Sequence, residues 1–307
     1  MVCLTTDIFL MKKNLLLVCA LLLSKISIAQ INTDLISVDV KYAAGKLVLV
    51  AGSEAKITDR PLYDNQPNFI NEKQLAFSAA DEKGNHDIII YNFESGKFTN
   101  LTKTSDYKEY SPSLTDCRLY VSAITVEPDG KQRLWLYPTN FGEPELLYDD
   151  IEPVGYYDWY NNKAVMFVLG SPNKLVYPYS KSDILTIGQN VGRSVKKRPG
   201  TSIVTYVDKN ISQQINGLMA FAIKGFDLEK RIYFDYGFTL PGSEDFIWLD
   251  KNHLLMAKGS ELFLKKTTDD SWKLTGNITL DSHEKISRMA YSKPLKKLVL
   301  TMERKRI

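Results

Sequence analysis

Seven residues, spread along the chain at a nearly regular spacing, have side chains that could together bind a small ligand. Arginine offers parallel N–H donors to a carboxylate or phosphate. Acidic side chains can receive an amine, and tyrosine and glutamine add neutral hydrogen-bonding groups. Polar groups that converge in a concave place are typical of a ligand site. The seven are Gln66, Tyr110, Tyr156, Arg193, Glu244, Asp245 and Arg288.

These residues lie at matching places in a repeated unit. In the first unit, strand-forming runs at 74–78, 87–91 and 98–102 are separated by polar turns. Matching positions recur at intervals of 45, 45, 38, 51 and 43 residues, at Asn65, Tyr110, Gly155, Arg193, Glu244 and Ser287. A period in the forties with four short strands per unit is typical of a β-propeller. The sequence therefore predicts an all-β fold, a six-bladed β-propeller.

The two ends of the repeat region complement each other. The sixth unit ends at residues 297–301 with two strands, while residues 34–40 and 46–51 form two strands that belong to no unit. We expect the N-terminal strands to complete the last blade, which removes exposed sheet edges. The prediction is a single propeller over residues 34–305. The first strand of each blade would line a central channel, so the seven residues should surround one mouth of it.

Signatures of catalysis are absent from the sequence. No Gly-x-Ser-x-Gly elbow, Gly-x-Gly-x-x-Gly turn or phosphate-binding loop occurs. Glu244 and Asp245 are adjacent and would point to opposite faces of a strand, so they do not form a glycosidase pair. The sequence favours a non-catalytic protein that needs no cofactor. The alternative is a small periplasmic hydrolase or lyase that acts on peptides or sugars and uses Tyr156, Arg193 and Glu244, three of the seven residues at the channel mouth.

No metal site is predicted. The three histidines, His86, His253 and His283, lie in different units and have no ligand at metal spacing. Residues 81–87 contain several oxygen ligands around a glycine, but they match the β-turn that every unit has at this place. Asp87 is expected to bond backbone groups of a turn. Cys117 lies in a turn with no histidine nearby in the sequence, so we expect a passive thiol.

The first 29 residues have the features of a cleaved export signal. A basic start at 11–14 precedes an apolar run at 15–23, and small residues up to Ala29 suit a signal peptidase. The run is too short to cross a bilayer, which needs about 20 residues. We expect a signal peptide over residues 1–29, with 1–10 as an upstream extension, and a periplasmic or secreted protein without a membrane span. Lipidation at Cys19 is the alternative, although Val18 is not the small residue a lipoprotein signal has there.

Composition and charge limit the classes of partner that the protein is expected to bind. The chain is 44% hydrophobic and 24% charged with a net charge of +3, which excludes a disordered chain. It lacks the basic excess of a nucleic-acid binder. We expect an envelope protein, a peptide or a small anionic ligand as the partner.

Several stretches resemble the repeat of TolB-type, WD40-like propellers. In the first unit they are residues 66–69, 75–78, 84–88 and 100–102. Over residues 34–301 the chain is similar to a family of exported TolB-like six-bladed propeller proteins common in Bacteroidetes, with further matching stretches at 63–67, 109–112, 153–156, 192–194, 198–200 and 240–245. The resemblance implies the fold and export, and it assigns no activity. The repeat's Ser-Pro-Asp-Gly turn is replaced here at residues 71–73 and 115–117.

Overall fold

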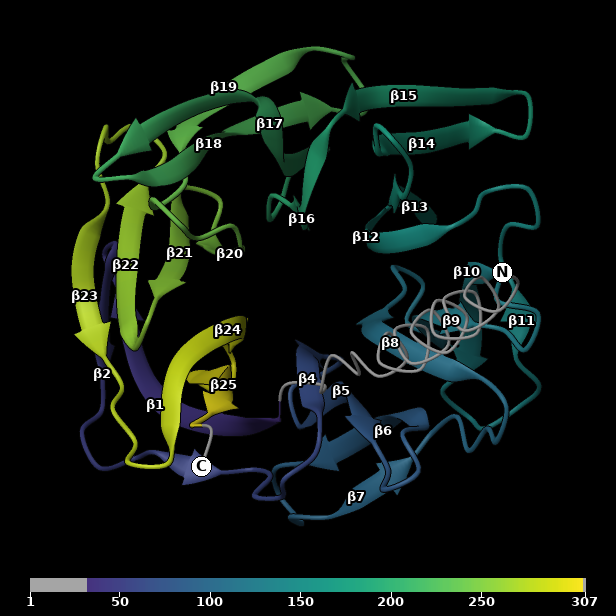
Figure 1. Ribbon diagram of the computed structural model, residues 1–307, viewed down its shortest axis with the longest axis horizontal. Coiled ribbons are helices and arrows are strands. Elements are labelled where there is room, and N and C mark those ends of the chain that lie inside the picture. The colour runs from purple at the N-terminus through teal and green to yellow at the C-terminus, as the bar shows by residue number, and fades with distance from the viewer. Residues whose placement is uncertain (1–31, 306–307) are drawn as a thin grey trace, which may run out of the picture. The chain divides into compact units, whose positions relative to one another are not determined.

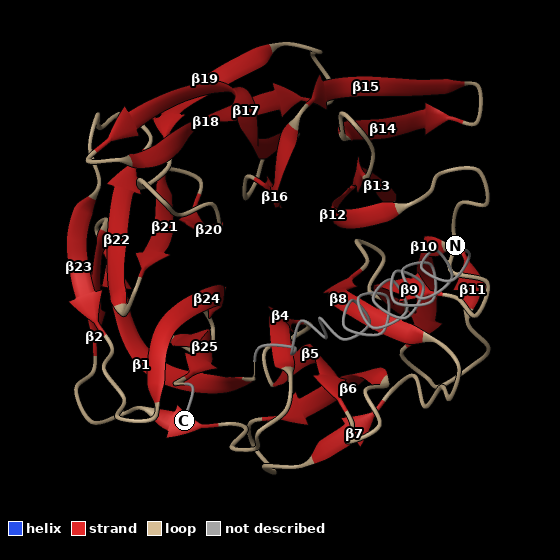
Figure 2. Ribbon diagram, viewed as in Figure 1, coloured by secondary structure: helices blue, strands red, loops and turns tan. Residues whose placement is uncertain are grey.

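The computed structural model of the protein describes residues 32–305, which are built from 25 β-strands without a helix. The sheets stand around a common centre, as Figure 1 and Figure 2 show. The predicted all-β, propeller-like arrangement is therefore confirmed. Within this part of the chain no helix has the length and apolar character needed to cross a membrane. The predicted signal peptide, residues 1–29, lies outside the described residues.

The first repeat shows why these residues form strands. Its strands are β4 (Asp64–Phe69), β5 (Gln74–Ala80), β6 (His86–Asn92) and β7 (Phe98–Asn100). β5 is a nearly continuous buried run, whereas buried and partly exposed side chains alternate along β6, the period of a strand with one covered face. In the turn between them, Asp81 accepts hydrogen bonds from the N–H groups of Lys83 (2.8 Å) and Asn85 (2.9 Å). Gly84 has a φ of 78°, which glycine adopts without strain.

The strands form five hydrogen-bonded sheets. The second repeat joins the first through one parallel residue pair, His86 with Lys108, so that the two make an eight-stranded sheet. The second repeat contains β8 (Lys108–Leu114), β9 (Tyr120–Val126), β10 (Gln132–Pro138) and β11 (Glu145–Leu146). Three four-stranded sheets follow in chain order. The first contains β12 (Val154–Tyr160), β13 (Lys163–Val168), β14 (Lys174–Ser180) and β15 (Asp183–Gln189). The second contains β16 (Val191–Lys197), β17 (Ile203–Ile215), β18 (Leu218–Asp227) and β19 (Tyr233–Phe238), and the third contains β20 (Phe246–Asp250), β21 (His253–Lys258), β22 (Glu261–Lys266) and β23 (Lys273–Asn277).

The fifth sheet joins the two ends of the described chain. It contains β24 (His283–Ser292) and β25 (Lys297–Arg304) together with β1 (Thr33–Ala43), β2 (Lys46–Leu49) and β3 (Ala55–Lys56). β1 pairs antiparallel with β25 over seven residue pairs, from Thr33 with Glu303 to Asp39 with Lys297. The prediction that N-terminal strands complete the last sheet is confirmed. Its physical reason is that neither β1 nor β25 is left with an open edge on this side.

A buried polar cluster reinforces this closure. The side chains of Asp34 and His283 are both fully buried, and His283 Nε2 lies 2.9 Å from Asp34 Oδ2. Arg304 Nε forms an ion pair with the same oxygen at 2.6 Å. Asp34 Oδ1 accepts a hydrogen bond from the N–H group of Arg60 at 3.1 Å. One carboxylate in β1 thus links β24, β25 and the segment that precedes β4.

The apolar core lies between neighbouring sheets. One cluster joins Ile124 of β9 to Trp159 of β12, and another joins Val207 of β17 to Trp248 of β20. Trp159 and Trp248 are only 4% and 8% exposed, and Phe69 is partly buried against a third cluster. These aromatic residues therefore pack in the core. Such packing fixes each sheet against the next and so holds their first strands in place around the centre.

Candidate ligand site at the channel mouth

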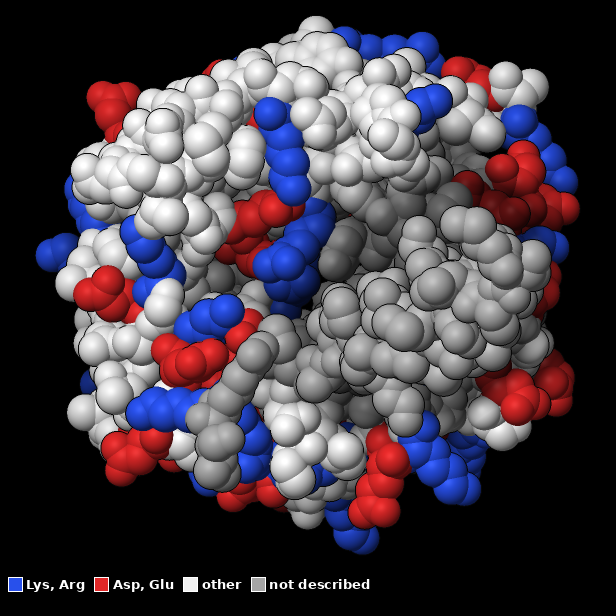
Figure 3. All heavy atoms as spheres, viewed as in Figure 1, with Lys and Arg blue, Asp and Glu red and all other residues white. Residues whose placement is uncertain are grey.

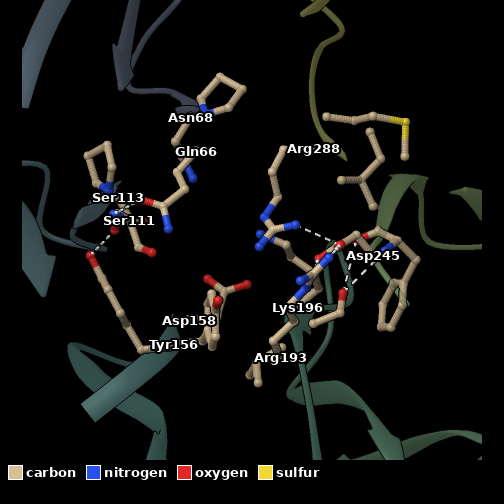
Figure 4. Close-up of a pocket in the computed structure, with 18 residues that line it drawn as sticks. Gln66, Asn68, Ser111, Ser113, Tyr156, Asp158, Arg193, Lys196, Asp245 and Arg288 are labelled. Carbon is tan, nitrogen blue, oxygen red and sulfur yellow. Dashed lines mark hydrogen bonds and ion pairs between the residues drawn. The ribbon is translucent and has the colours of Figure 1, made fainter. Parts of the chain in front are cut away.

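The first strands of all six repeats line one cavity at the centre, with a volume of about 80 Å³. These strands are β4, β8, β12, β16, β20 and β24. We call this space the central cavity; Figure 4 shows the side chains that point into it. Segments more than 200 residues apart in the sequence therefore contribute to one site, as the repeat predicts.

The strands are irregular where the site residues lie. Pairing with the second strand shifts register between Asn65 and Asn68 in β4 and between Val191 and Val195 in β16. Similar shifts occur in β8, β12 and β24. A bulge breaks the alternation of a strand and re-aims a side chain. Gln66, inside the β4 shift, has a φ of 58°, which is unusual for a residue with a Cβ atom.

Two arginines and one carboxylate form a charged wall of the cavity. Arg193 Nε donates to both oxygens of Asp245 (3.2 and 3.1 Å), and Arg193 Nη2 donates to Oδ2. Arg288 Nη1 donates to the same Oδ2 at 2.7 Å. Burial alone would lower the pKa of Arg193, but the hydrogen bonds and charge of Asp245 outweigh burial and raise it. Two cations share one anion, so these three side chains carry a net positive charge.

The opposite wall is polar. Asp158 points into the cavity across from Arg288 in Figure 4, beside Tyr156. Its carboxylate accepts hydrogen bonds from the backbone N–H groups of Trp159 (2.8 Å) and Lys197 (2.6 Å), which ties β12 to β16. Figure 4 also shows Gln66 on this side of the gap. The central cavity thus separates an arginine pair from an acidic and amide wall.

A second cavity, with a volume of about 370 Å³, adjoins the central one, and Arg193, Asp245 and Arg288 line both. Glu244 lines only the second cavity, where it forms an ion pair with Lys209 at 3.1 Å and accepts a hydrogen bond from the Arg193 N–H group. Figure 3 shows basic and acidic side chains gathered beside the hollow on this face. The two cavities together form the channel mouth.

Of the seven predicted residues, five line the central cavity and two do not. Gln66, Tyr156, Arg193, Asp245 and Arg288 line the central cavity. Glu244 lines the second cavity alone, and Tyr110 lines neither. The ring of Tyr110 instead packs against His86, with ring centroids 4.7 Å apart, next to the core cluster of the second repeat.

The polar lining residues that the sequence did not predict include Asn68, Ser113, Asp158 and Lys196. Each lies two or three residues beyond a predicted or neighbouring position on the same strand. Residues two apart on a strand share a face, so extending the search by two residues along each first strand would have found Asn68 and Asp158.

The structure also bears on the other candidate residues. Asp87 accepts a hydrogen bond at 3.1 Å from the N–H group of Thr104, which lies between β7 and β8 and not in the turn before β6. Cys117 is exposed and forms no disulfide bond within residues 32–305. Among residues 32–305 no group of three or more His, Cys, Asp or Glu side chains is placed to hold a metal ion.

Comparison with known proteins supports the fold alone. A scan against models of protein families finds no match, and a search of the curated proteins finds none. Among solved structures, a putative TolB from Agrobacterium tumefaciens superposes with a TM-score of 0.66 at 7% identity, covering 91% of this chain and 100% of that one. A chain of a nidogen/laminin complex has a TM-score of 0.60 at 10% identity, covering 84% and 97%. An oligogalacturonate lyase in complex with manganese has a TM-score of 0.54 at 8% identity, covering 85% and 82%. The protein has a TolB-like propeller fold.

Proposed function

We propose that the protein is an exported, non-catalytic, six-bladed β-propeller that binds a protein, a peptide or a small anionic ligand at its channel mouth. The supporting observation is that Arg193 and Arg288 share the single carboxylate of Asp245 at the edge of a cavity. The count of six treats the eight-stranded sheet as two blades, because its halves are joined by one residue pair only. Unrelated activities occur on one propeller fold, so the proposal rests on the site and not on the fold.

The arginine pair suits an anion for two reasons. First, the charges of Arg193, Arg288 and Asp245 sum to +1, so an incoming carboxylate or phosphate meets a net positive group. Second, each guanidinium has five N–H donors, more than the bonds to Asp245 use. Asp245 holds both side chains in place before a ligand arrives, which reduces the entropy lost on binding.

Export and an envelope partner complete the proposal. The basic start, apolar run and small residues of positions 11–29 support a signal peptide that is cleaved near Ala29. The mature protein would then act in the periplasm or outside the cell. Its channel mouth would meet envelope proteins, peptides or small anions there.

Replacing Arg193 or Arg288 by alanine is expected to weaken binding at least about tenfold, because each change removes a charged hydrogen-bond donor. A thermal-shift screen against short peptides, amino acids, sugars and phosphates would first identify a ligand, since binding to the folded state raises the melting temperature. Titration calorimetry would then compare the variants.

Arg231→Ala is the matched control. Arg231 is also an exposed arginine in an ion pair, with Asp183 at 3.2 Å, but it lines neither cavity. Its loss should leave the affinity unchanged. Equal affinity in the parent protein, Arg193→Ala and Arg288→Ala would refute the site.

A further inference from the structure

The hairpin of β17 and β18 extends beyond its sheet. β17 has 13 residues and β18 has 10, whereas the middle strands of the other four-stranded sheets have 6 or 7. After a register shift between Asp208 and Ser212, four more residue pairs lead to Ile215 opposite Leu218. The turn is Asn216-Gly217, and both residues have positive φ (51° and 77°). A two-residue Asn-Gly turn of this kind matches the twist of a hairpin, so the extension is a regular structure.

The end of this hairpin presents apolar side chains to solvent. We call residues 210–219 the arm; every one of them is exposed. Four of these residues have large apolar side chains: Ile211 (42% exposed), Ile215 (40%), Leu218 (42%) and Met219 (40%). A single exposed apolar residue is ordinary, but a group of them on one element marks an interaction site.

The base of the arm forms a wall of the second cavity. Met219 and Phe221 line this cavity together with Arg193 and Arg288. The Met219 carbonyl accepts a hydrogen bond from the Gly242 N–H group at 2.8 Å, in the segment that leads to Glu244 and Asp245. The apolar arm is therefore joined to the charged wall through the backbone.

Leu218 lies over the same segment. A Cβ atom on Gly242 would come 3.3 Å from Leu218 Cδ1, and Gly242 has a φ of 79°. Glycine at this position lets the backbone turn beneath the leucine. Leu218 thus lies next to Gly242 in the cavity wall, although Leu218 itself does not line the cavity.

We propose that the channel mouth binds the C-terminal end of a peptide whose last residue is apolar. Its free carboxylate would bind Arg193 and Arg288, and its last side chain would pack against Met219 at the base of the arm. This inference rests on the proposed function, because it uses the same arginine pair, and it adds the class of ligand.

Two observations favour this occupant. A C-terminal residue carries a carboxylate and a side chain on one Cα atom, and Arg193 and Met219 line the same cavity. The cavity also presents the hydroxyl groups of Ser243 and Ser287. Each donates to a backbone carbonyl, of Ala257 and Thr301, and its oxygen can still accept a hydrogen bond from a peptide N–H group, which an alkyl chain lacks. The charge of the arginine pair and the apolar surface of the arm thus both complement such a peptide end.

The experiment measures three synthetic probes by titration calorimetry with the purified protein: N-acetyl-Gly-Gly-Leu with a free carboxylate, its C-terminal amide, and N-acetyl-Gly-Gly-Gly with a free carboxylate. We expect the leucine acid to bind about tenfold more tightly than the glycine acid, from burial of its side chain. We expect the amide to bind at least about tenfold more weakly than the acid. The variant Met219→Ser should bind the leucine acid no better than the glycine acid, and its affinity for the glycine acid should stay that of the parent.

Ile232→Ser is the control. Ile232 is 47% exposed but lines neither cavity, so its loss should change no affinity. Equal binding of the two acids by the parent protein, equal losses for both in Met219→Ser, or no binding of the leucine acid would overturn this inference. Phosphate and acetate distinguish this failure from a failure of the proposed function. If either anion binds the parent protein but not Arg193→Ala, the proposed function still holds. If no anion binds through Arg193, both fail.

Discussion

Replacing Asp34 by alanine is expected to lower the free energy of unfolding by about 3–5 kcal/mol, because the change removes a fully buried carboxylate that His283 and Arg304 both contact and leaves buried polar groups without this partner. Asp34 is fully buried and lies within 2.9 Å of His283 and 2.6 Å of Arg304. The same substitution removes the acceptor of the Arg60 N–H group. Urea unfolding at neutral pH, with the slope checked for a two-state transition, would measure the loss.

Asp39→Ala is a matched control on the same pair of strands. Asp39 of β1 forms an ion pair with Lys297 of β25, but the Asp39 side chain is 48% exposed. An exposed ion pair contributes about 0–1 kcal/mol, so this variant should remain close to the parent. Similar losses in the two variants would show that the buried cluster is not what fastens β1 to the last sheet.

The closure of the fold could be predicted, but this cluster could not. Two unassigned N-terminal strands and an incomplete last unit predict the pairing of β1 with β25, since both have open edges otherwise. Asp34 and His283 are 249 residues apart, and nothing in their spacing indicates contact. Their pairing follows from the register of β1 on β25, which the strand pattern leaves undetermined.

The site, like the fold, could be predicted only in part. The repeat predicts which strands meet at the centre, and it placed Arg193, Asp245 and Arg288 together because matching residues of different repeats share a position in the fold. It did not predict the bulges, which decide whether a given residue faces the cavity or a neighbouring sheet. Tyr110 is the example: it lies at a matching position, yet its ring packs on His86.

The arm could not be recognised from the repeat either. The interval that contains it, from Arg193 to Glu244, is 51 residues and the longest of the five. That excess signals an insertion without saying where it lies. The Asn216-Gly217 dipeptide between alternating residues was the available sign of a hairpin. Its position beside the channel mouth depends on the hydrogen bond from Gly242 to Met219, which only the folded chain reveals.

The second large effect concerns Glu109 of β8, a fully buried acid. Its Oε1 accepts hydrogen bonds from Thr104 (2.8 Å) and Tyr137 (3.3 Å), and its Oε2 has no partner among the described residues. Burial raises the pKa of Glu109 from 4.5 to about 7. The folded protein therefore keeps this proton over a range of pH in which the unfolded chain has lost it.

The sign of the pH dependence follows from that difference. Below pH 4.5 Glu109 is protonated in both states and its titration contributes nothing. Between pH 4.5 and about 7 the folded state binds more protons than the unfolded state, so stability falls as pH rises. The full cost, on the order of 3 kcal/mol, is reached above pH 7.

Glu109→Gln should remove this dependence, because glutamine has similar size and does not titrate. The stability of the variant minus that of the parent is expected to rise by about 3 kcal/mol from pH 4.5 to pH 7.5, whatever constant offset the buried amide adds. Urea unfolding at several pH values would measure this difference, and the titration of His86 cancels because both proteins contain it.

Glu127→Gln should show the opposite sign. The hydrogen bond from Arg133 lowers the pKa of Glu127, so the stability that the ionised Glu127 contributes is present above its ordinary pKa and is lost as pH falls. The difference in stability between Glu109→Gln and the parent could instead be the same at every pH. That result would mean that Glu109 titrates alike in the folded and unfolded chain, and that its burial is relieved by water or by movement of β8.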